Sequence, residues 1–233
     1  MSPSSRLQAL PPVPVRHEGS PGFSDLEFSV SGGRVYCATK RLFDLAVALA
    51  GLALLLPLLP AVIVLIKLDS PGSIFFRQKR VGQGGRLFTC YKFRSMVQDA
   101  EALKPHLAEL NEATGPAFKI REDPRITAIG AFLRRSSLDE VPQLFNVLLG
   151  QMSIIGPRPQ IPTEVELYEP WHCRRLEVKP GITCLWQVSG RSHIGFDEWM
   201  RLDLEYVRTR GWRTDLKILL RTLPAVIARK GAY

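Results

Sequence analysis

The sequence lacks the short motifs that mark the most common enzymes of phosphate and acyl chemistry. It contains no glycine-rich phosphate loop followed by lysine, no paired-histidine metal motif and no nucleophile elbow. These absences exclude the common nucleotide-hydrolase and esterase templates. Any chemistry that the chain performs therefore depends on residues in a less common arrangement.

Cysteine is scarce as well, with four residues in a chain of 233. Cys37, Cys90, Cys173 and Cys184 show no close metal-ligand spacing, and a disulfide framework is not expected in a reducing compartment. We interpret the four cysteines as ordinary small apolar residues.

Long hydrophobic runs are limited to one, an uncharged stretch from Leu45 to Ile66 that is interrupted by Pro57 and Pro60. About 20 apolar residues are enough to cross a bilayer. Basic residues flank both ends, so a simple crossing would place one cationic cluster on the wrong face of the membrane. Because proline kinks a helix, residues 34–68 are predicted to form a re-entrant membrane helix bent at the two prolines. A plain spanning helix is the alternative.

The formal net charge is +9, and the basic residues gather around the apolar run. Nine basic residues lie between Lys40 and Arg94, against two acidic ones. This placement favours phospholipid head groups or a lipid-borne phosphate as the partner. Nucleic acid is not expected, because no helix-turn-helix, zinc or aromatic RNA-binding motif is present. A non-catalytic basic scaffold on a membrane surface remains an alternative.

The ends of the chain set the expected domain organisation. Residues 1–33 alternate proline with serine and glycine and show no apolar periodicity, so we expect a disordered tail. A cleavable signal peptide is not expected, because the apolar core begins only after Arg41. Residues 69–233 are predicted to form one globular domain, the part that would carry any catalytic activity.

Local patterns predict an α+β fold that is mostly helical. Ile74–Phe76 and Leu87–Phe93 are predicted to pair as a small β-hairpin. Helices are expected over Gln98–Asn111, Val141–Leu149, Phe196–Val207 and Leu216–Ile227. The last two are candidates for interfacial amphipathic helices, because tryptophan, tyrosine and arginine accompany them; an ordinary core with a solvated face explains these residues equally well.

Two adjacent carboxylates, Asp139 and Glu140, closely follow two adjacent guanidinium groups, Arg134 and Arg135. A structural explanation is a helix capping box between Ser137 and Glu140. The functional explanation is that one carboxylate attacks a phosphorus atom while the other holds a divalent cation. Such an attack on an anionic diphosphate requires Mg²⁺ and nearby arginines to neutralise the phosphoryl oxygens.

Two further groups of cations are candidates for phosphate binding. Pro157 and Pro159 restrict the backbone around Arg158, which presents its guanidinium with little freedom to lose. Lys92 and Arg94 occupy alternate positions of the predicted second strand and therefore share one face. A stiff surface loop and a solvated strand face are the alternatives.

Together these motifs resemble those of the bacterial sugar transferases of the monotopic phosphoglycosyl transferase family. The similarity runs from Lys40 to Tyr233, and the segments that carry it are KRLFDL at Lys40, DSPGSIFFRQKRVG at Asp69, YKFRSM at Tyr91, DPRITAIGAFLRRSSLDEVPQLFNVLLGQMSIIGPRP at Asp123 and KPGITCLWQVSGR at Lys179. The resemblance implies a re-entrant helix at the cytoplasmic face of the bacterial inner membrane. It also implies transfer of a sugar phosphate from a UDP-sugar to undecaprenyl phosphate in exopolysaccharide biosynthesis.

By the same resemblance, Asp139 would be the nucleophile that forms a phosphosugar intermediate and releases UMP, and Glu140 would bind Mg²⁺. Further phosphate and nucleotide contacts are expected at Lys92, Arg94, Arg134, Arg135, Arg158 and Arg191. The segments GPAFKI at Gly115 and GAY at Gly231 resemble the hexose-1-phosphate transferases, so galactose or glucose is favoured. Anionic lipids are expected partners, and a homo-oligomer is compatible with the sequence.

The chain departs from the family pattern at three positions. Leu56, where the family usually has serine, precedes Pro57, so no hydroxyl is available at the kink and Pro60 is expected to share the bend. Cys184 stands where glycine is typical, and Gln151 replaces an acidic residue. Neither Cys184 nor Gln151 is expected to take part directly in the proposed chemistry.

Overall fold

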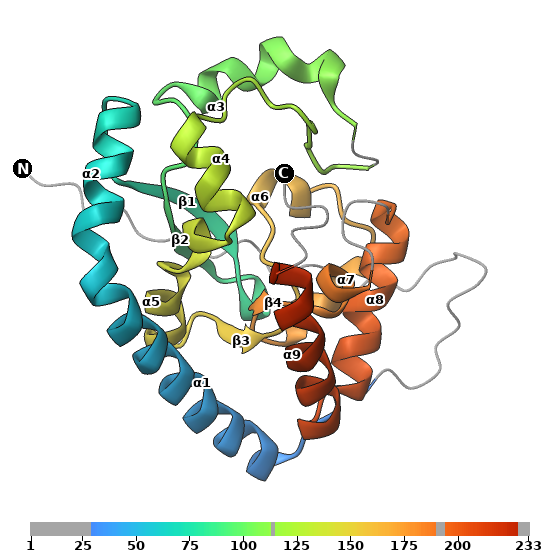
Figure 1. The fold of residues 1–233 in the computed structure, drawn as a ribbon. Helices are drawn as coiled ribbons and strands as arrows, with labels where there is room; N and C mark the ends of the chain where they lie inside the picture. Colours follow the sequence, from blue (N-terminus) through green and yellow to red (C-terminus); the bar gives the residue numbers. More distant parts are fainter. Residues whose placement is uncertain (1–28, 113–114, 190–193, 228–233) are drawn as a thin grey trace, which may run out of the picture.

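The fold is mainly helical, with two small two-stranded sheets, and a long N-terminal helical segment runs along one side of the body (Figure 1). The computed structural model describes residues 29–112, 115–189 and 194–227. The predicted tail lies outside these residues except for 29–33, and so do Arg191 and the terminal GAY segment. The observed elements agree with the predicted mixed, mostly helical class.

The N-terminal segment consists of α1 (Arg34–Leu55), a 3₁₀ turn (Leu56–Leu58) and α2 (Leu59–Asp69). Pro57 and Pro60 are the second residues of the 3₁₀ turn and of α2, and so lie in the first turn of each. The missing proline N–H is tolerated in a first turn but not in a helix interior, which explains why the helix changes type here. By length and composition, residues 34–69 are long and apolar enough to cross a membrane.

Two basic residues of α1 attach this helix to the body of the molecule. Lys40 Nζ lies 2.8 Å from Asp215 Oδ2 in α9 (Trp212–Ile227), and both side chains are nearly buried. Arg41 donates to the carbonyls of Val147 at 2.6 Å and Leu148 at 2.9 Å. These carbonyls lie at the end of α5 (Gln143–Leu148), where the last carbonyls of a helix lack intrahelical partners; that of Val147 also accepts from the Gly150 amide at 3.0 Å.

An acidic residue on the same helix makes a third attachment. Asp44 Oδ1 accepts hydrogen bonds from Ser153 Oγ at 3.1 Å and from the Ile154 amide at 3.0 Å, both in β3 (Ser153–Ile155). Asp44 is buried, although it begins the most apolar part of the chain. Lys40, Arg41 and Asp44 therefore bind the body of the molecule, whereas Arg34 at the first position of α1 is exposed.

The predicted β-hairpin is confirmed. β1 (Phe75–Val81) and β2 (Leu87–Phe93) pair in antiparallel fashion, with Phe75 opposite Phe93 and Val81 opposite Leu87. β1 extends beyond the predicted three residues because its exposed basic positions, such as Arg77 and Lys79, hide the apolar alternation. Positive φ angles at Gly84 and Gly85, 65° and 75°, let the connecting turn close.

A second pairing was not predicted from the sequence. β3 runs parallel to β4 (Gly181–Thr183), with Ser153 opposite Gly181 and Ile155 opposite Thr183. A side chain at Gly181 would place its Cβ 2.1 Å from the Gly156 nitrogen, so glycine is required for this close approach. The pairing brings residues 156–158 next to residues 179–183.

The helices occur where the periodicity predicted them, with differences at their ends. The predicted helix at 98–111 is a short α3 (Ala100–Leu103) followed by a 3₁₀ segment (Lys104–Leu110), and α9 begins four residues before the predicted Leu216. The other elements are α4 (Ala128–Arg135), a 3₁₀ turn (Leu138–Glu140), α6 (Pro162–Val165), a 3₁₀ helix (His172–Glu177), α7 (Leu185–Val188) and α8 (Phe196–Thr209). α4 was not predicted.

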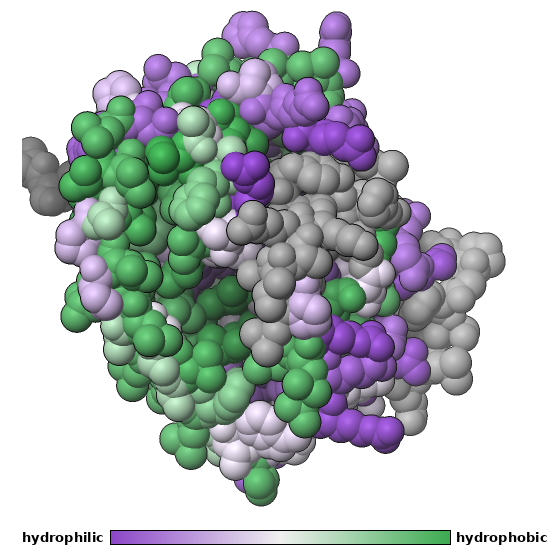
Figure 2. Space-filling view, in the orientation of Figure 1, coloured by the Kyte–Doolittle hydropathy of each residue, from purple (hydrophilic) through white to green (hydrophobic). Residues whose placement is uncertain are grey.

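Apolar side chains fill the interior and also cover part of the surface. The main core cluster joins residues of α1, β2, α5, β3, α7, α8 and α9, such as Ala48, Phe88, Val147 and Ile218. Apolar residues also gather on the face formed by α1 and α2 and their neighbours (Figure 2). The exposed members in the N-terminal helical segment and in α4, α5 and α9 include Leu42, Leu49, Leu54, Leu56, Leu58, Val64, Leu68, Phe132, Phe145, Trp212, Leu216 and Leu220.

Candidate active site

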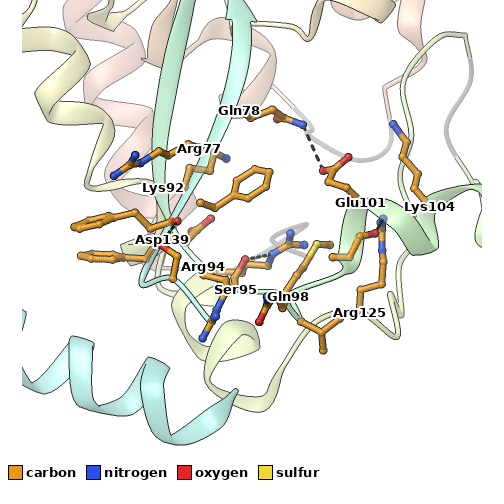
Figure 3. Close-up of a pocket in the computed structure, with 18 of the residues that line it drawn as sticks. Arg77, Gln78, Lys92, Arg94, Ser95, Gln98, Glu101, Lys104, Arg125 and Asp139 are labelled. Atoms are coloured by element: carbon orange, nitrogen blue, oxygen red, sulfur yellow. Dashed lines mark hydrogen bonds between the residues drawn. The ribbon is translucent and has the colours of Figure 1, made fainter. Parts of the chain in front are cut away.

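A cavity of about 560 Å³ opens beside the β1–β2 hairpin, and its charged lining residues are mainly basic (Figure 3). Its seven basic lining residues are Arg77, Arg80, Lys92, Arg94, Lys104, Arg125 and Arg134, against three acidic ones, Glu101, Asp139 and Glu164. A concave site with this excess of positive charge attracts anionic ligands. Of the two candidate catalytic carboxylates, Asp139 lines this cavity.

The local chain reverses sharply to place Asp139 there. α4 ends at Arg135, and Ser137 then adopts a left-handed conformation with φ of 57°, which is uncommon for a residue other than glycine. The 3₁₀ turn Leu138–Glu140 follows, and Pro142 precedes α5. The Ser137 side chain makes no capping hydrogen bond, so the capping-box explanation of this segment is wrong.

Glu140 is held by two cations that come from different elements. Its Oε1 accepts from Lys92 Nζ of β2 at 2.7 Å and from Arg158 Nη2 at 2.7 Å. Burial alone would raise the pKa of Glu140, but the charges of Arg158 and Lys92 outweigh this effect and hold the pKa far below its usual range. Glu140 is therefore ionised and fixed in place.

Asp139 has the opposite environment. Its side chain is buried and forms no hydrogen bond within the part of the chain that the structure describes. Burial raises the pKa of Asp139 to about 6; the Lys92 charge opposes this shift and the Glu140 charge adds to it. Adjacent carboxyl groups whose pKa values are driven apart are typical of sites that divide chemical roles between them.

Of the remaining predicted site residues, Arg134 lines the cavity near Asp139. Its Nε donates to Ser95 Oγ at 3.0 Å, just after β2. Most of the guanidinium is thus left to face the cavity. Arg135, by contrast, is exposed and does not line the cavity, and Arg191 lies outside the described residues.

Arg94 also lines the cavity, but it has a structural task that the sequence did not indicate. Its guanidinium donates to the carbonyls of Pro71 at 2.5 Å, Ser70 at 2.6 Å and Ile66 at 3.3 Å. It thereby binds the carboxyl end of α2 and the turn that follows. This position ties the apolar helical segment to the strand that carries Lys92.

Arg80 is a candidate site residue that sequence reasoning missed. Its Nη1 donates to the Pro159 carbonyl at 2.9 Å and its Nη2 to Gln78 Oε1 at 2.5 Å, and the side chain lines the cavity. In the sequence it is one of several cations that follow the apolar run. No sequence pattern separates Arg80 from those other cations. The structure does, because β1 extends to Val81 and carries Arg80 to the cavity.

The carboxylates can hold Mg²⁺ only together with other ligands. The described residues contain no cluster of three or more His, Cys, Asp or Glu side chains that could hold a metal. Mg²⁺ usually keeps several waters and binds one or two carboxylates plus substrate phosphates, so the adjacent Asp139 and Glu140 fit that requirement. Glu140 Oε2 is the freer oxygen, since its contact with Arg158 Nη1 is 3.5 Å long.

Known proteins with similar sequences share nearly the whole of the described chain. The galactosyl transferase CpsE of Streptococcus agalactiae is 43% identical over 213 residues, 91% of this chain and 47% of its own length. The exopolysaccharide production protein ExoY of Sinorhizobium fredii is 39% identical over 199 residues, 84% of this chain and 88% of its own length.

A third relative is the UDP-glucose:undecaprenyl-phosphate glucose-1-phosphate transferase of Xanthomonas campestris, 42% identical over 207 residues, 85% of this chain and 40% of its own length. The chain therefore spans less than half of CpsE and of the Xanthomonas protein, but most of ExoY. In addition, the profile of the family described as "Bacterial sugar transferase" matches residues 35–229. The chain belongs to the bacterial sugar transferase family, as its motifs predict.

Proposed function

We propose that this protein transfers a hexose 1-phosphate from a UDP-sugar to undecaprenyl phosphate and releases UMP. The observation that carries the proposal is Asp139, a buried carboxyl without a hydrogen-bond partner among the described residues, which lines a cation-rich cavity beside the ionised Glu140. The names of the relatives support the same class of reaction, since one is a galactosyl transferase and another a UDP-glucose:undecaprenyl-phosphate glucose-1-phosphate transferase.

In the first step, a carboxylate oxygen of Asp139 attacks the phosphorus that carries the sugar. A bond forms between this oxygen and phosphorus, and the bond from phosphorus to the bridging oxygen breaks, so that UMP leaves with the electron pair. Lys92 and Arg134 lie where they can stabilise charge on the phosphoryl oxygens. Mg²⁺, when bound at Glu140, supplies further neutralisation of that charge.

In the second step, an oxygen of undecaprenyl phosphate attacks the same phosphorus. The aspartyl oxygen–phosphorus bond breaks, which regenerates the Asp139 carboxylate and yields undecaprenyl diphosphate hexose. Two successive displacements use one nucleophile for a water-soluble donor and a lipid acceptor. A covalent intermediate thus removes the need to bind both substrates at once.

The same proposal places the protein at the cytoplasmic face of the bacterial inner membrane, with α1 and α2 as a re-entrant helix. Supporting features are the break at Pro57 and Pro60, the basic residues on both flanks and the exposed apolar side chains of these helices. α2 packs on α4, whose carboxyl end leads into the turn that holds Asp139. A lipid acceptor in the membrane surface would then meet the nucleophile from that side.

Galactose or glucose is the proposed sugar, and the relatives' names include both. Discrimination between such epimers depends on a few hydrogen bonds to one hydroxyl. A direct screen is the release of UMP from UDP-glucose, UDP-galactose and UDP-N-acetyl sugars, measured with the purified full-length protein, undecaprenyl phosphate and Mg²⁺. Release of UMP from one of the hexose donors is expected, and no release from any donor contradicts the proposal.

The covalent step has its own test. Without acceptor, a UDP-sugar that is radiolabelled in the sugar is expected to label the protein, with one UMP released per labelled chain. The Asp139→Asn variant is expected to take up no label. If the wild-type protein releases UMP only when acceptor is present, the transfer stands but the intermediate is wrong. A non-catalytic scaffold would bind anionic vesicles equally well with either residue at position 139 and release no UMP.

A further inference from the structure

The backbone on both sides of Arg158 is held at three successive carbonyls, each by a donor from a different element. The Gly181 amide donates to the Pro157 carbonyl at 2.9 Å, Arg175 Nη2 to the Arg158 carbonyl at 2.7 Å, and Arg80 Nη1 to the Pro159 carbonyl at 2.9 Å. Loops are usually more mobile than the elements that they connect, whereas this one is held at three points and carries Arg158, one of the two cations that bind Glu140.

Of the two donors that are side chains, Arg175 is buried and Arg80 is half-buried. The Arg175 side chain is 2% exposed, and its partner Asp203 in α8 is 0% exposed. Arg175 Nε and Nη2 both donate to Asp203 Oδ2, at 2.9 and 2.5 Å, and Nη1 donates to the Tyr168 hydroxyl at 2.9 Å. A fully buried ion pair is weak evidence of stabilisation, because desolvation of the charges offsets much of their attraction.

We propose that Arg175, oriented by Asp203, is a positioning residue for the transfer reaction: it fixes the carbonyl of Arg158 and so directs the Arg158 side chain to Glu140. The inference rests on the proposed function, in which Glu140 serves the phosphoryl transfer. Rotation about the Cα–C bond of Arg158 changes the direction of its side chain relative to its carbonyl. A carbonyl that is held in place therefore limits the directions that the side chain can take. Pro157 and Pro159 limit the other backbone angles of the loop, so the hydrogen bond from Arg175 fixes the remaining freedom.

The competing explanation is that Arg175 and Asp203 only stabilise the fold. The double variant Arg175→Met with Asp203→Leu separates the two, because it removes both charges and leaves no unpaired ion in the core. The anchor of the Arg158 carbonyl is then lost while the packing volume is largely kept. We expect a melting temperature close to that of the wild type, a kcat at least about tenfold lower and a KM for the UDP-sugar within about threefold.

Tyr168→Phe is the matched control, because it removes a partner of the same guanidinium on the side away from Arg158. Its kcat is expected to stay within about twofold of the wild type. A folded double variant with a kcat within twofold of the wild type overturns the inference. So does a Tyr168→Phe variant that loses as much activity as the double variant.

If the double variant does not fold, Arg175→Lys tests the same positioning role. A lysine ammonium keeps the ion pair with Asp203 but has no planar fork to span Asp203 and the Arg158 carbonyl. A tenfold loss of kcat in a folded Arg175→Lys protein supports the inference, and unchanged turnover overturns it.

Failure of the proposed function would be visible separately, as absence of UMP from the wild-type protein with every donor. The inference then still has a structural readout, a crystal structure of the double variant. Arg158 is expected to lie beyond hydrogen-bond distance of Glu140 there, and an intact contact between them would overturn the inference.

Discussion

Asp139 and Glu140 are neighbours in the chain, yet their surroundings drive their carboxyl groups toward different protonation states. The sequence was sufficient to single out both residues and to suggest Lys92 and Arg158 as cations. It could not show that both cations converge on Glu140, because β2 and the loop after β3 supply them from far apart in the chain. A buried Asp139 that lacks a partner among the described residues likewise depends on tertiary packing.

The raised pKa of Asp139 predicts a pH-dependent stability effect. The folded-state pKa, about 6, exceeds the unfolded value near 4, so the folded state binds more protons and loses stability as pH rises between these values. Asp139→Asn is therefore expected to raise the free energy of unfolding at pH 8 by on the order of 1–3 kcal/mol and to change little at pH 4.

Thermal unfolding in detergent without Mg²⁺, scanned from pH 4 to pH 8, measures this difference. A variant that is less stable than the wild type at pH 8 would show that the fold stabilises the charge of Asp139 and lowers its pKa, which contradicts the prediction. The same preparations would show a complete loss of sugar-phosphate transfer.

Glu140→Gln is expected to lower the free energy of unfolding, in contrast to Asp139→Asn. The depressed pKa of Glu140 means that its contribution to stability is present above the unfolded pKa, near 4.3, and is lost as pH falls through the depressed folded value. Removal of its charge leaves Lys92 and Arg158 without their shared anion and should cost up to about 3–5 kcal/mol at pH 7. The transfer rate should fall and lose its dependence on Mg²⁺.

Glu198→Gln makes the same chemical change in an exposed pair, where Glu198 lies 3.9 Å from Arg201. Its effect on the free energy of unfolding should stay below about 1 kcal/mol. Equal losses of stability in the two variants, compared by thermal unfolding, would mean that the buried ion pairs of Glu140 contribute no more than an exposed pair does.

At the level of elements, the periodic helices and the hairpin were predictable, but α4 and the β3–β4 pair were not. α4 has eight residues and starts at a Thr127 cap whose partner is the Gly130 amide, so it carries no glutamate or glutamine at the usual capping position. β3 and β4 have three residues each, too few for a detectable alternation. Both features nevertheless shape the site, since α4 carries Arg134 and β3 leads to Arg158.

Gly130→Ala tests how closely α4 must approach β2. A Cβ at Gly130 would lie 2.0 Å from the Ser95 carbonyl oxygen, so α4 would have to move away from the strand end. We expect a loss of stability of about 1–3 kcal/mol and weaker donor binding, because Arg134 would lose its hydrogen bond to Ser95.

The control is Gly33→Ala, where no atom lies within 4 Å of the added methyl group. Differential scanning fluorimetry and the KM for the UDP-sugar report the two effects. Identical behaviour of the two alanine variants would argue that α4 is free to shift.

At the level of the whole molecule, composition and charge placement were enough to predict an apolar helical segment between cationic flanks. The helical periodicity at 216–227 already made α9 a candidate for the interface, but nothing in the sequence revealed that exposed apolar residues of α4 and α5 extend the apolar surface, because those residues alternate with polar ones. The family assignment needed no structure, since long motifs spread over the chain carry it and a family profile matches residues 35–229.

This surface predicts how membrane binding can be removed without unfolding the protein. Leu54 and Leu56 are 74% and 68% exposed, so lysine at both positions should leave the packing of the core intact. Each charge near the middle of a bilayer costs about 2.5–3.5 kcal/mol, and the double variant should no longer float with vesicles of phosphatidylethanolamine and phosphatidylglycerol.

Leu167→Lys is the control, since Leu167 is 69% exposed but lies outside α1 and α2. It should float as the wild type does. Undiminished flotation of the Leu54→Lys, Leu56→Lys protein would indicate that other parts of the chain attach it to the bilayer.

The inward-facing Lys40, Arg41 and Asp44 have a practical consequence for anyone who wishes to handle the catalytic part alone. Truncation of the N-terminal helices would strip Asp215 of its ammonium partner, uncap the end of α5 and leave β3 donors without their acceptor. Such a shortened protein should precipitate or melt at room temperature. If the protein binds the membrane as proposed, its purification calls for detergent or nanodiscs from the first step, because the apolar helical segment cannot be removed without loss of these buried contacts.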